Sequence, residues 1–334
     1  LGVEQVGVTD NFFTLGGDSI KAIQIVARLQ KYKLKLDVKD LITYPTIKRV
    51  KRHIKEVERE AEQGLINGEV PLTPIQNWLW QGDRDKINQF VHPLLLHSKQ
   101  TIDIGIIQQV LAELVEHHDT LRMVYYQDGE DIKQINRGLT GELSTFTTRD
   151  LQDIAKPEGI IREEIIKEQK KMDLAHGPLM RTILFKTNTG DHLLIMVHHL
   201  VIDGLSWRVL LEDLTIGYQQ AISKEKITFQ KKTDSYQLWS QGLEAYASSS
   251  KLERELPYWQ EIEAIEQGLL ADKPIITDLV QIEFDFLEQV IDIEKTEKLL
   301  TKTNKAYGTE INDILLAALV KTYGQLTENE QMVI

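Results

Sequence analysis

The sequence predicts a multidomain fold, in which a small all-α unit precedes an α/β unit. Three observations support this division. The protein has 334 residues, enough for two domains or more. Residues 1–60 contain 12 of the 39 Lys+Arg residues and 8 of the 51 Asp+Glu residues, so this segment is basic. The remaining residues contain 27 Lys+Arg and 43 Asp+Glu and are acidic. The apolar run 193–197, typical of a strand buried on both faces, leads into a helical pattern.

Composition excludes several classes of protein. Hydrophobic content of 42% and charged content of 27% are typical of a soluble globular protein. The absence of cysteine excludes disulfides, thiolate metal ligands and a cysteine nucleophile, and it suits a reducing compartment. No apolar run approaches the ~20 residues that cross a bilayer, and no signal segment opens the sequence, so we expect a cytoplasmic protein without a membrane partner. The acidic remainder argues against nucleic acid as a partner.

The first unit runs from residue 1 to about residue 56, and its centre is a glycine-containing loop that enters a helix. Asp18 is placed to cap that helix, and Ser19 lies in its first turn. The apolar residues that follow recur at helical spacing: Ala22, Ile25, Val26 and Leu29. The free N–H groups and the positive end of the helix dipole favour a negatively charged group attached at Ser19.

The segment Leu15–Ser19, Leu-Gly-Gly-Asp-Ser, resembles the attachment motif of thiolation (peptidyl carrier) domains. The resemblance implies a four-helix bundle in which Ser19 carries 4′-phosphopantetheine. It includes Tyr44–Ile47 at the start of a last short helix, whereas the first helix of such a bundle would precede Leu1. Asp18 gives the form of the motif that is associated with carriers serving an epimerization domain. An ordinary capped helix is the alternative.

Residues 57–70 are predicted to form a linker, because they contain charges and two glycines but little apolar periodicity. The next unit begins at residue 71. Its first element is a helix that starts at Pro74 after a capping Thr73. The two tryptophans of this helix, Trp78 and Trp80, predict that it anchors a core.

Helices and strands then alternate along the sequence. We expect helices over 107–118, 160–172 and 309–323, helices beginning near Ser235 and Leu256, a strand over 123–126, a hairpin of strands 182–186 and 192–197, and a strand over 284–293. A polar stretch over 268–279 is predicted to separate two lobes. No metal site is predicted, because His117 and His118 are adjacent on a helix and cannot share a face.

Two adjacent histidines, His198 and His199, lie at the end of the apolar run 193–197. An Asp203-Gly204 turn and a helix follow, and Ser206 is predicted to cap that helix. Successive residues of a strand point to opposite faces, so one ring faces a reaction channel while the other packs behind it. A pair of buried core histidines is the alternative.

The motif His-His-x-x-x-Asp-Gly over residues 198–204 resembles that of the chloramphenicol-acetyltransferase-like superfamily, which includes condensation and epimerization domains of nonribosomal peptide synthetases. The segments Gly204–Trp207, Pro74–Trp78 and Asp313–Ala317 are similar to epimerization motifs. The resemblance implies α/β lobes, the first over residues 71–270 and an incomplete second over 271–334. The whole sequence resembles the initiation enzymes of gramicidin-type synthesis.

This resemblance implies inversion at the Cα of a carrier-bound aminoacyl or peptidyl thioester. His199 is implied as one acid/base, with His198 as its supporting neighbour, and an imidazole with a pKa of ~6.5 can serve in either protonation state. Asp203 is expected to be structural and paired with Arg122. The second acid/base is expected from a downstream Glu-Gly-His-Gly-Arg-Glu segment that these 334 residues do not contain, so this segment alone is expected to be inactive.

The resemblance also implies partners. They are an upstream adenylation domain, which would select the amino acid, and the downstream condensation domain of a partner synthetase. Because the sequence begins at Leu1 without Met, we expect it to be a piece of a larger protein. Two alternatives to an epimerization domain stay open: a condensation domain that uses His199 in amide formation, and a non-catalytic module that docks a carrier.

Overall fold

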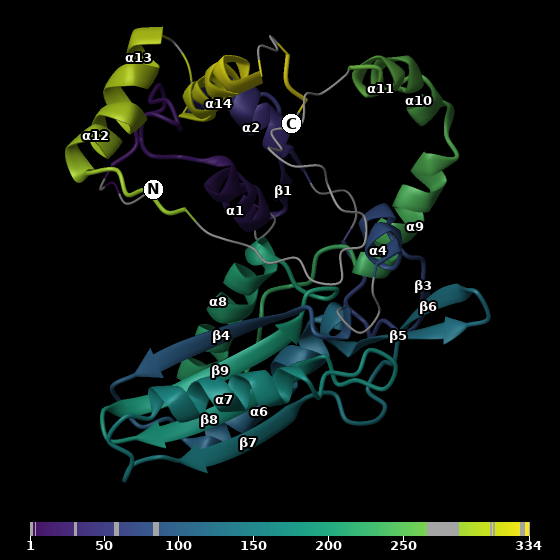
Figure 1. Ribbon diagram of the computed structural model, residues 1–334, viewed down its shortest axis with the longest axis vertical. Helices are drawn as coiled ribbons and strands as arrows, with labels where there is room; N and C mark the ends of the chain where they lie inside the picture. The colour runs from purple at the N-terminus through teal and green to yellow at the C-terminus, as the bar shows by residue number, and fades with distance from the viewer. Residues whose placement is uncertain are drawn as a thin grey trace. The chain divides into compact units, whose positions relative to one another are not determined.

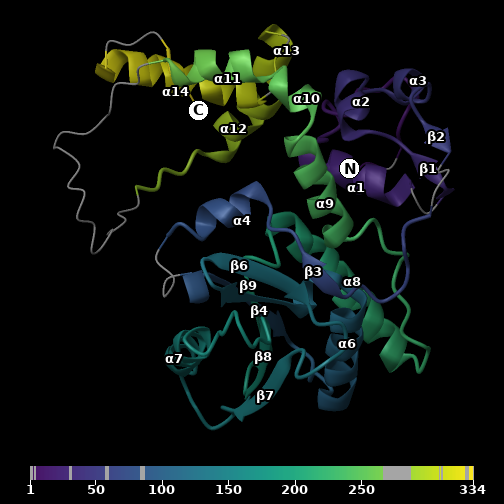
Figure 2. The ribbon, with the colours of Figure 1, turned by 90° about the vertical axis from the view of Figure 1, so that its right-hand side faces the viewer.

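The computed structural model describes residues 3, 5–29, 32–56, 60–82, 87–265, 287–307, 309, 311–327 and 331–333 (Figure 1). The chain divides into two compact units. One consists of residues 1–13 and 17–248, and the other of residues 14–16 and 249–334. Both sheets of the α/β region belong to the first unit (Figure 2).

The N-terminal segment of the first unit folds around a small apolar core. It forms α1 (Ser19–Leu29), α2 (Val38–Thr43), α3 (Ile47–Val50) and a ribbon of β1 (Leu34–Lys35) with β2 (Lys55–Glu56). The buried core residues are Phe12, Ala22, Leu36, Leu41 and Val50. The predicted four-helix bundle is not seen in the described residues, because the α-helices of this segment are α1, α2 and α3. The predicted short helix after Tyr44–Pro45 is confirmed as α3, which Thr46 caps.

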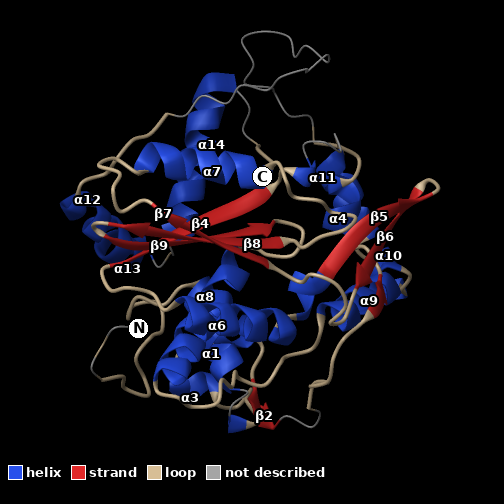
Figure 3. Cartoon of the chain, turned by 90° about the horizontal axis from the view of Figure 1, so that it is seen from below, coloured by secondary structure: helices blue, strands red, loops and turns tan. Residues whose placement is uncertain are grey.

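The centre of the first unit is a four-stranded sheet in the order β4–β9–β8–β7. Its strands are β4 (Val91–Ser98), β9 (Gly190–His198), β8 (Met180–Thr187) and β7 (Thr145–Asp150). β9 pairs antiparallel with β4 and β8, whereas β7 pairs parallel with β8. Helices α6 (Ile104–His117) and α8 (Gly204–Ile222) lie on one face and α7 (Glu158–Gln169) lies on the other (Figure 3).

This cover explains the apolar run in the sequence. Residues 193–197 of β9 are at most 2% exposed, since helices lie over both faces of the sheet. The predicted hairpin is confirmed, because β8 and β9 are joined by a two-residue turn at Asn188–Thr189. Gly190 follows with φ +127°, and a Cβ there would lie 2.3 Å from the Ser98 carbonyl oxygen. Only glycine fits this turn without a shift of the backbone.

A second, three-stranded sheet has the order β3–β6–β5. β3 (Gly68–Val70) pairs antiparallel with β6 (Asp131–Asn136), which pairs antiparallel with β5 (Met123–Asp128). β3 lies within the stretch predicted as a linker. Helix α4 (Pro74–Leu79) begins where predicted, but only Trp80 packs against the core, whereas Trp78 is 68% exposed.

The remaining elements are η2 (Asp119–Arg122), α9 (Tyr236–Ala247), α10 (Ser250–Glu253), α11 (Leu256–Glu263), α12 (Ile293–Glu297), the π-helical turn η3 (Lys298–Thr303), α13 (Asn304–Tyr307) and α14 (Ile311–Thr327). α14 confirms the predicted last helix. The strand predicted over 284–293 is wrong where the structure describes it, because residues 287–292 are irregular and Asp292 caps α12 by accepting from the Lys295 N–H at 2.8 Å.

The polar stretch 268–279, predicted to separate two lobes, lies outside the described residues. Among the helices that are described, none combines the length and the apolar character needed to cross a membrane.

Candidate functional site

His198 is the last residue of β9 and is fully buried. Its Nε2 lies 2.7 Å from the Ile87 carbonyl oxygen, and its Nδ1 accepts a hydrogen bond from the Leu200 N–H at 3.1 Å. Because a carbonyl oxygen only accepts, the single ring proton is on Nε2. Burial lowers the pKa of His198 to about 4. His198 is therefore a neutral ring that joins the backbone of Ile87, which precedes β4, to the backbone of Leu200, which follows β9.

His199 is the first residue beyond β9, and its ring is half-buried. Its N–H donates to the Phe90 carbonyl oxygen at 2.9 Å, and its ring Nδ1 lies 2.8 Å from the Ile202 carbonyl oxygen. This contact places a proton on Nδ1, so the neutral ring keeps its lone pair on Nε2. Within the described residues, Nε2 has no hydrogen-bond partner. His199 is thus oriented as a base with one free nitrogen.

Two aromatic rings from the neighbouring edge of the sheet pack against His199. The Phe90 ring stacks on it with centroids 4.6 Å apart, and the His92 ring lies 3.9 Å from it. Burial and the neighbouring His199 both lower the pKa of His92, which favours its neutral form. His92 is not predicted as a site residue, because β4 is not among the predicted strands and only the pairing of β4 with β9 brings His92 to the site.

Asp203 caps α8 and makes no ion pair with Arg122. Its carboxylate accepts hydrogen bonds from the Ser206 N–H at 2.7 Å and the Ser206 hydroxyl at 2.6 Å. Partial burial opposes ionisation of the carboxyl group, but these hydrogen bonds hold the pKa of Asp203 below its ordinary value. Ser206 was predicted to cap α8, but that prediction is wrong. Asp203 is the cap, and Ser206 donates the hydrogen bonds that it accepts.

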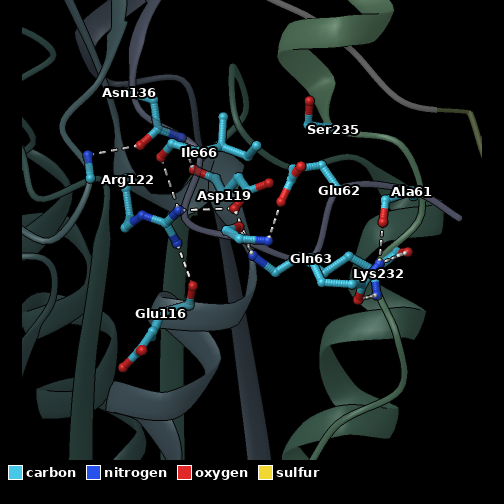
Figure 4. Close-up of polar contacts among 12 residues, drawn as sticks. Ala61, Glu62, Gln63, Ile66, Glu116, Asp119, Arg122, Asn136, Lys232 and Ser235 are labelled. Atoms are coloured by element: carbon cyan, nitrogen blue, oxygen red, sulfur yellow. Dashed lines mark hydrogen bonds and ion pairs between the residues drawn. The ribbon is translucent and has the colours of Figure 1, made fainter.

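Arg122 is fully buried and pairs with Asp119, three residues before it, at 2.9 Å (Figure 4). It also donates to the carbonyl oxygens of Val115 at 2.7 Å and Glu116 at 2.6 Å. The predicted Arg122–Asp203 pair is thus wrong. Asp119 lies within η2 itself, so this short helix supplies the carboxylate that the guanidinium contacts.

The described part of the predicted linker is held on the lobe. Gln63 and Lys232 exchange two hydrogen bonds, from the Gln63 amide to the Lys232 carbonyl oxygen at 3.0 Å and from the Lys232 N–H to the Gln63 side-chain oxygen at 2.9 Å (Figure 4). The Lys232 ammonium also donates to the Gly64 carbonyl oxygen at 3.1 Å and lies 3.3 Å from Asp119. Residues 60–70 are therefore a strap rather than a free tether.

Ser19 is exposed and is the first residue of α1. The side chain of Asp18 accepts from the Lys21 N–H at 2.8 Å, which confirms Asp18 as the cap. A Cβ on Gly17 would lie 2.5 Å from the Phe12 carbonyl oxygen, so the loop before the serine needs glycine there. An exposed hydroxyl at the start of an 11-residue helix fits a covalently attached phosphodiester.

The structure brings His198, His199 and Asp203 into one turn after β9. In the part of the chain that it describes, no group of three or more His, Asp or Glu is placed to hold a metal ion.

Comparisons with known proteins match both parts of the chain. Residues 66–334 match the family described as Condensation domain, and residues 1–54 match the family described as Phosphopantetheine attachment site. Tyrocidine synthase 1 of Brevibacillus parabrevis is 43% identical over 335 residues, which cover 100% of this chain. Gramicidin S synthase 1 of Brevibacillus brevis is 44% identical over 320 residues, which cover 96% of this chain. The chain spans 31% and 29% of the length of these two relatives.

Solved structures agree on the fold. The epimerization domain from the third module of tyrocidine synthetase B is 40% identical, with a TM-score of 0.72 over 81% of this chain and 61% of that one. The first condensation domain of the calcium-dependent antibiotic synthetase is 21% identical, with a TM-score of 0.59 over 78% of this chain and 62% of that one. The second likeness shows the shared α/β lobe fold alone.

Proposed function

Because the chain belongs to the Condensation domain family and carries a phosphopantetheine attachment site ahead of that domain, we propose that it is the carrier and epimerization part of a nonribosomal peptide synthetase. The reaction is inversion of an L-aminoacyl or peptidyl thioester to the D form at Cα. The observation that carries this proposal is the geometry of His199, whose Nδ1 lies 2.8 Å from the Ile202 carbonyl oxygen while Nε2 stays free.

His199 exchanges the Cα proton through Nε2. The Ile202 carbonyl oxygen holds the proton on Nδ1, so that proton acceptance at Nε2 forms an imidazolium whose other N–H is already bonded. Phe90 and His92 limit rotation of the ring. His198 supports this arrangement as a neutral neighbour, and Asp203 starts the helix that follows the turn. Inversion also needs a second acid/base on the opposite face of the carbanion, which we place outside the described site.

Ser19 is the proposed attachment residue for 4′-phosphopantetheine. When attached, the arm carries the aminoacyl group as a thioester, which acidifies the Cα–H. The exposed hydroxyl of Ser19 and the N–H groups of the first turn of α1 are the features of this chain that suit a phosphodiester.

The proposed organisation is a carrier domain over residues 1–56, a linker over 57–70, a first lobe over 71–270 and the start of a second lobe over 271–334. The family matches at residues 1–54 and 66–334 support the end of the carrier domain and the start of the first lobe. Because Gln63 is bonded to Lys232, the residues held on the lobe begin nearer residue 60. We expect an adenylation domain to supply the amino acid and a partner condensation domain to accept the product.

Condensation is the second candidate, because the condensation domain of the antibiotic synthetase shares the fold. The 40% identity with an epimerization domain, against 21% with that condensation domain, favours epimerization. Chiral analysis of the thioester product in the synthetase that carries this chain separates the candidates. A D-configured residue supports the proposal. A new amide means condensation, and an unchanged L residue means that the domain only docks a carrier.

A further inference from the structure

A row of hydrogen bonds, buried except for the part-buried last one, connects the first helix of the lobe to the turn that carries His199. It begins at Thr73, which is 4% exposed, where the N–H and the hydroxyl both donate to the Gln76 side-chain oxygen at 3.0 and 3.2 Å. The Gln76 amide, 3% exposed, donates to the Tyr125 hydroxyl oxygen at 3.2 Å. The Tyr125 hydroxyl, in turn, donates to the Leu200 carbonyl oxygen at 3.1 Å.

Leu200 is held at both of its backbone groups. Its carbonyl oxygen accepts from Tyr125, and its N–H donates to Nδ1 of His198 at 3.1 Å. The N–H belongs to the peptide group that links Leu200 to His199, so fixing it fixes the backbone of His199 as well. The turn between His199 and Asp203 is thus tied to β5 and α4 as well as to β9.

We propose that Thr73, Gln76 and Tyr125 form a hydrogen-bonded relay that positions the turn carrying His199, so that the first helix of the lobe sets the orientation of the base. This inference deepens the proposed function and rests on it. The three residues act through Leu200 and do not contact the substrate, so they are positioning residues.

The polarity of the relay supports this assignment. Every donor in it points the same way along the row, from Thr73 to the Leu200 carbonyl oxygen, and hydrogen bonds aligned in this way strengthen one another. Burial, with the neighbouring Tyr236, raises the pKa of Tyr125 well above its ordinary value, so the hydroxyl keeps the proton that it donates. Removing this hydroxyl leaves the buried Gln76 amide and the part-buried Leu200 carbonyl oxygen without this partner.

The test uses Tyr125→Phe, with Tyr126→Phe as its matched control on the same strand, since Tyr126 is 38% exposed. In the synthetase that carries this chain, exchange of the Cα proton with deuterated water gives kcat and KM. We expect Tyr125→Phe to lower kcat about 10- to 100-fold with KM unchanged, because a small displacement of a catalytic group costs up to ~100-fold. Tyr126→Phe should match the wild type. A Tyr125→Phe enzyme with wild-type kcat overturns the inference.

A second variant covers the case in which Tyr125→Phe folds poorly. Gln76→Met keeps the Tyr125–Leu200 bond but removes the donor to Tyr125, and we expect a smaller fall in kcat. The double variant should lose no more than Tyr125→Phe alone, because both act in one relay. Losses that simply add, or a lower melting temperature with unchanged kcat, mean a structural role only.

A readout independent of catalysis separates this inference from the proposed function. In the 334-residue chain, Tyr125→Phe should speed solvent exchange of the Leu200 amide at least tenfold and shift the NMR signals of the His198 and His199 rings. Tyr126→Phe should do neither. If these changes occur but no residue is epimerised by the wild-type synthetase, the proposed function fails and the relay stands. If the Leu200 amide is unaffected, the relay is wrong.

Discussion

His198 and His199 are consecutive residues with opposite surroundings. His198 is fully buried, with both ring nitrogens bonded to the backbone, whereas His199 is half-buried and its Nε2 has no hydrogen-bond partner among the residues that the structure describes. The difference arises because β9 ends at His198 and the chain turns at once. A lone pair that is already bonded cannot accept a substrate proton, so we propose His199 rather than His198 as the base.

The burial of His198 predicts a pH dependence of stability. Its pKa is about 4 in the folded protein and ~6.5 in the unfolded chain, so the unfolded state binds more protons between these values. The free energy of unfolding should therefore fall as the pH drops from ~6.5 toward about 4. The neutral His198 ring accounts for ~3 kcal/mol of that free energy, which is fully present above pH ~6.5.

Urea denaturation at several pH values between 7 and 4 measures this effect. The variant His198→Gln cannot titrate but can still donate to Ile87 and accept from Leu200, so it should lose much of the decline seen in the wild type. An unchanged decline in the variant would show that other groups cause it.

Asp203 shows what the sequence could and could not predict at this scale. Its structural role was predictable from its place in a tight turn, but its partner was not. The family resemblance made Arg122 the expected partner, yet Asp119 is three residues from Arg122 and its carboxylate lies 2.9 Å from the guanidinium. Sequence spacing does not show which of two carboxylates a buried guanidinium will meet, because that depends on where η2 places them.

At the scale of elements, the cap on α8 gives a distinct prediction. Asp203→Ala removes the acceptor for the Ser206 N–H, and loss of an N-cap costs ~0.5–2 kcal/mol of unfolding free energy. Asp103→Ala is a matched control, because Asp103 caps α6 by accepting from the Ile106 N–H at 2.9 Å. Chemical denaturation should give similar losses for both. A loss of ~3–5 kcal/mol for Asp203→Ala alone would indicate a buried ion pair instead.

The start of α1 gives a second prediction at this scale. Coenzyme A with a phosphopantetheinyl transferase should add one arm to the wild-type protein, because Ser19 is exposed at a helix N-terminus. Intact mass measures the addition, and Ser19→Ala should abolish it. Ser206→Ala is a suitable control, since Ser206 also lies at the start of a helix but outside the carrier motif. Labelling that survives Ser19→Ala would contradict the assignment.

Strands buried on both faces were easier to predict than edge strands. The run 193–197 is apolar because helices cover both faces, so β9 was clear from the sequence. β4 was missed because it is an edge strand in which His92 and Pro93 leave an apolar run of only three residues, Leu94–Leu96. His92 lies on β4 and its ring contacts that of His199, so it was missed together with the strand. The motif residues were predictable, and the residues that reach the site through pairing were not.

At the scale of the whole molecule, the strap over residues 60–70 holds the described part of the predicted linker on the lobe. Glycines and charges predict a flexible linker, but they do not reveal that Gln63 and Gly64 each form hydrogen bonds with Lys232, which is 168 or more residues away in the sequence. Residues 60–70 are therefore held on the lobe, although they were predicted to be part of a linker.

Lys232→Met tests the strap. It removes the ammonium contacts to Gly64 and Asp119, each of which is a charge-assisted bond worth ~1.5–3 kcal/mol, and we expect proteases to cleave after Glu62 faster. Lys231→Met is the control, since its ion pair with Glu60 is exposed and should contribute little. Equal cleavage rates in the wild type and in Lys232→Met would mean that the linker is already free.

In the reaction that we propose, His199 exchanges the Cα proton of a thioester carried on Ser19. The most direct measurement loads the synthetase that carries this chain with an L-aminoacyl group in deuterated water and follows deuterium at Cα by mass spectrometry. We predict that deuterium enters as the D isomer appears and that His199→Ala slows the exchange ~10²–10⁴-fold, the usual loss for a general acid/base. Exchange at the wild-type rate in His199→Ala would contradict the proposed acid/base role of His199.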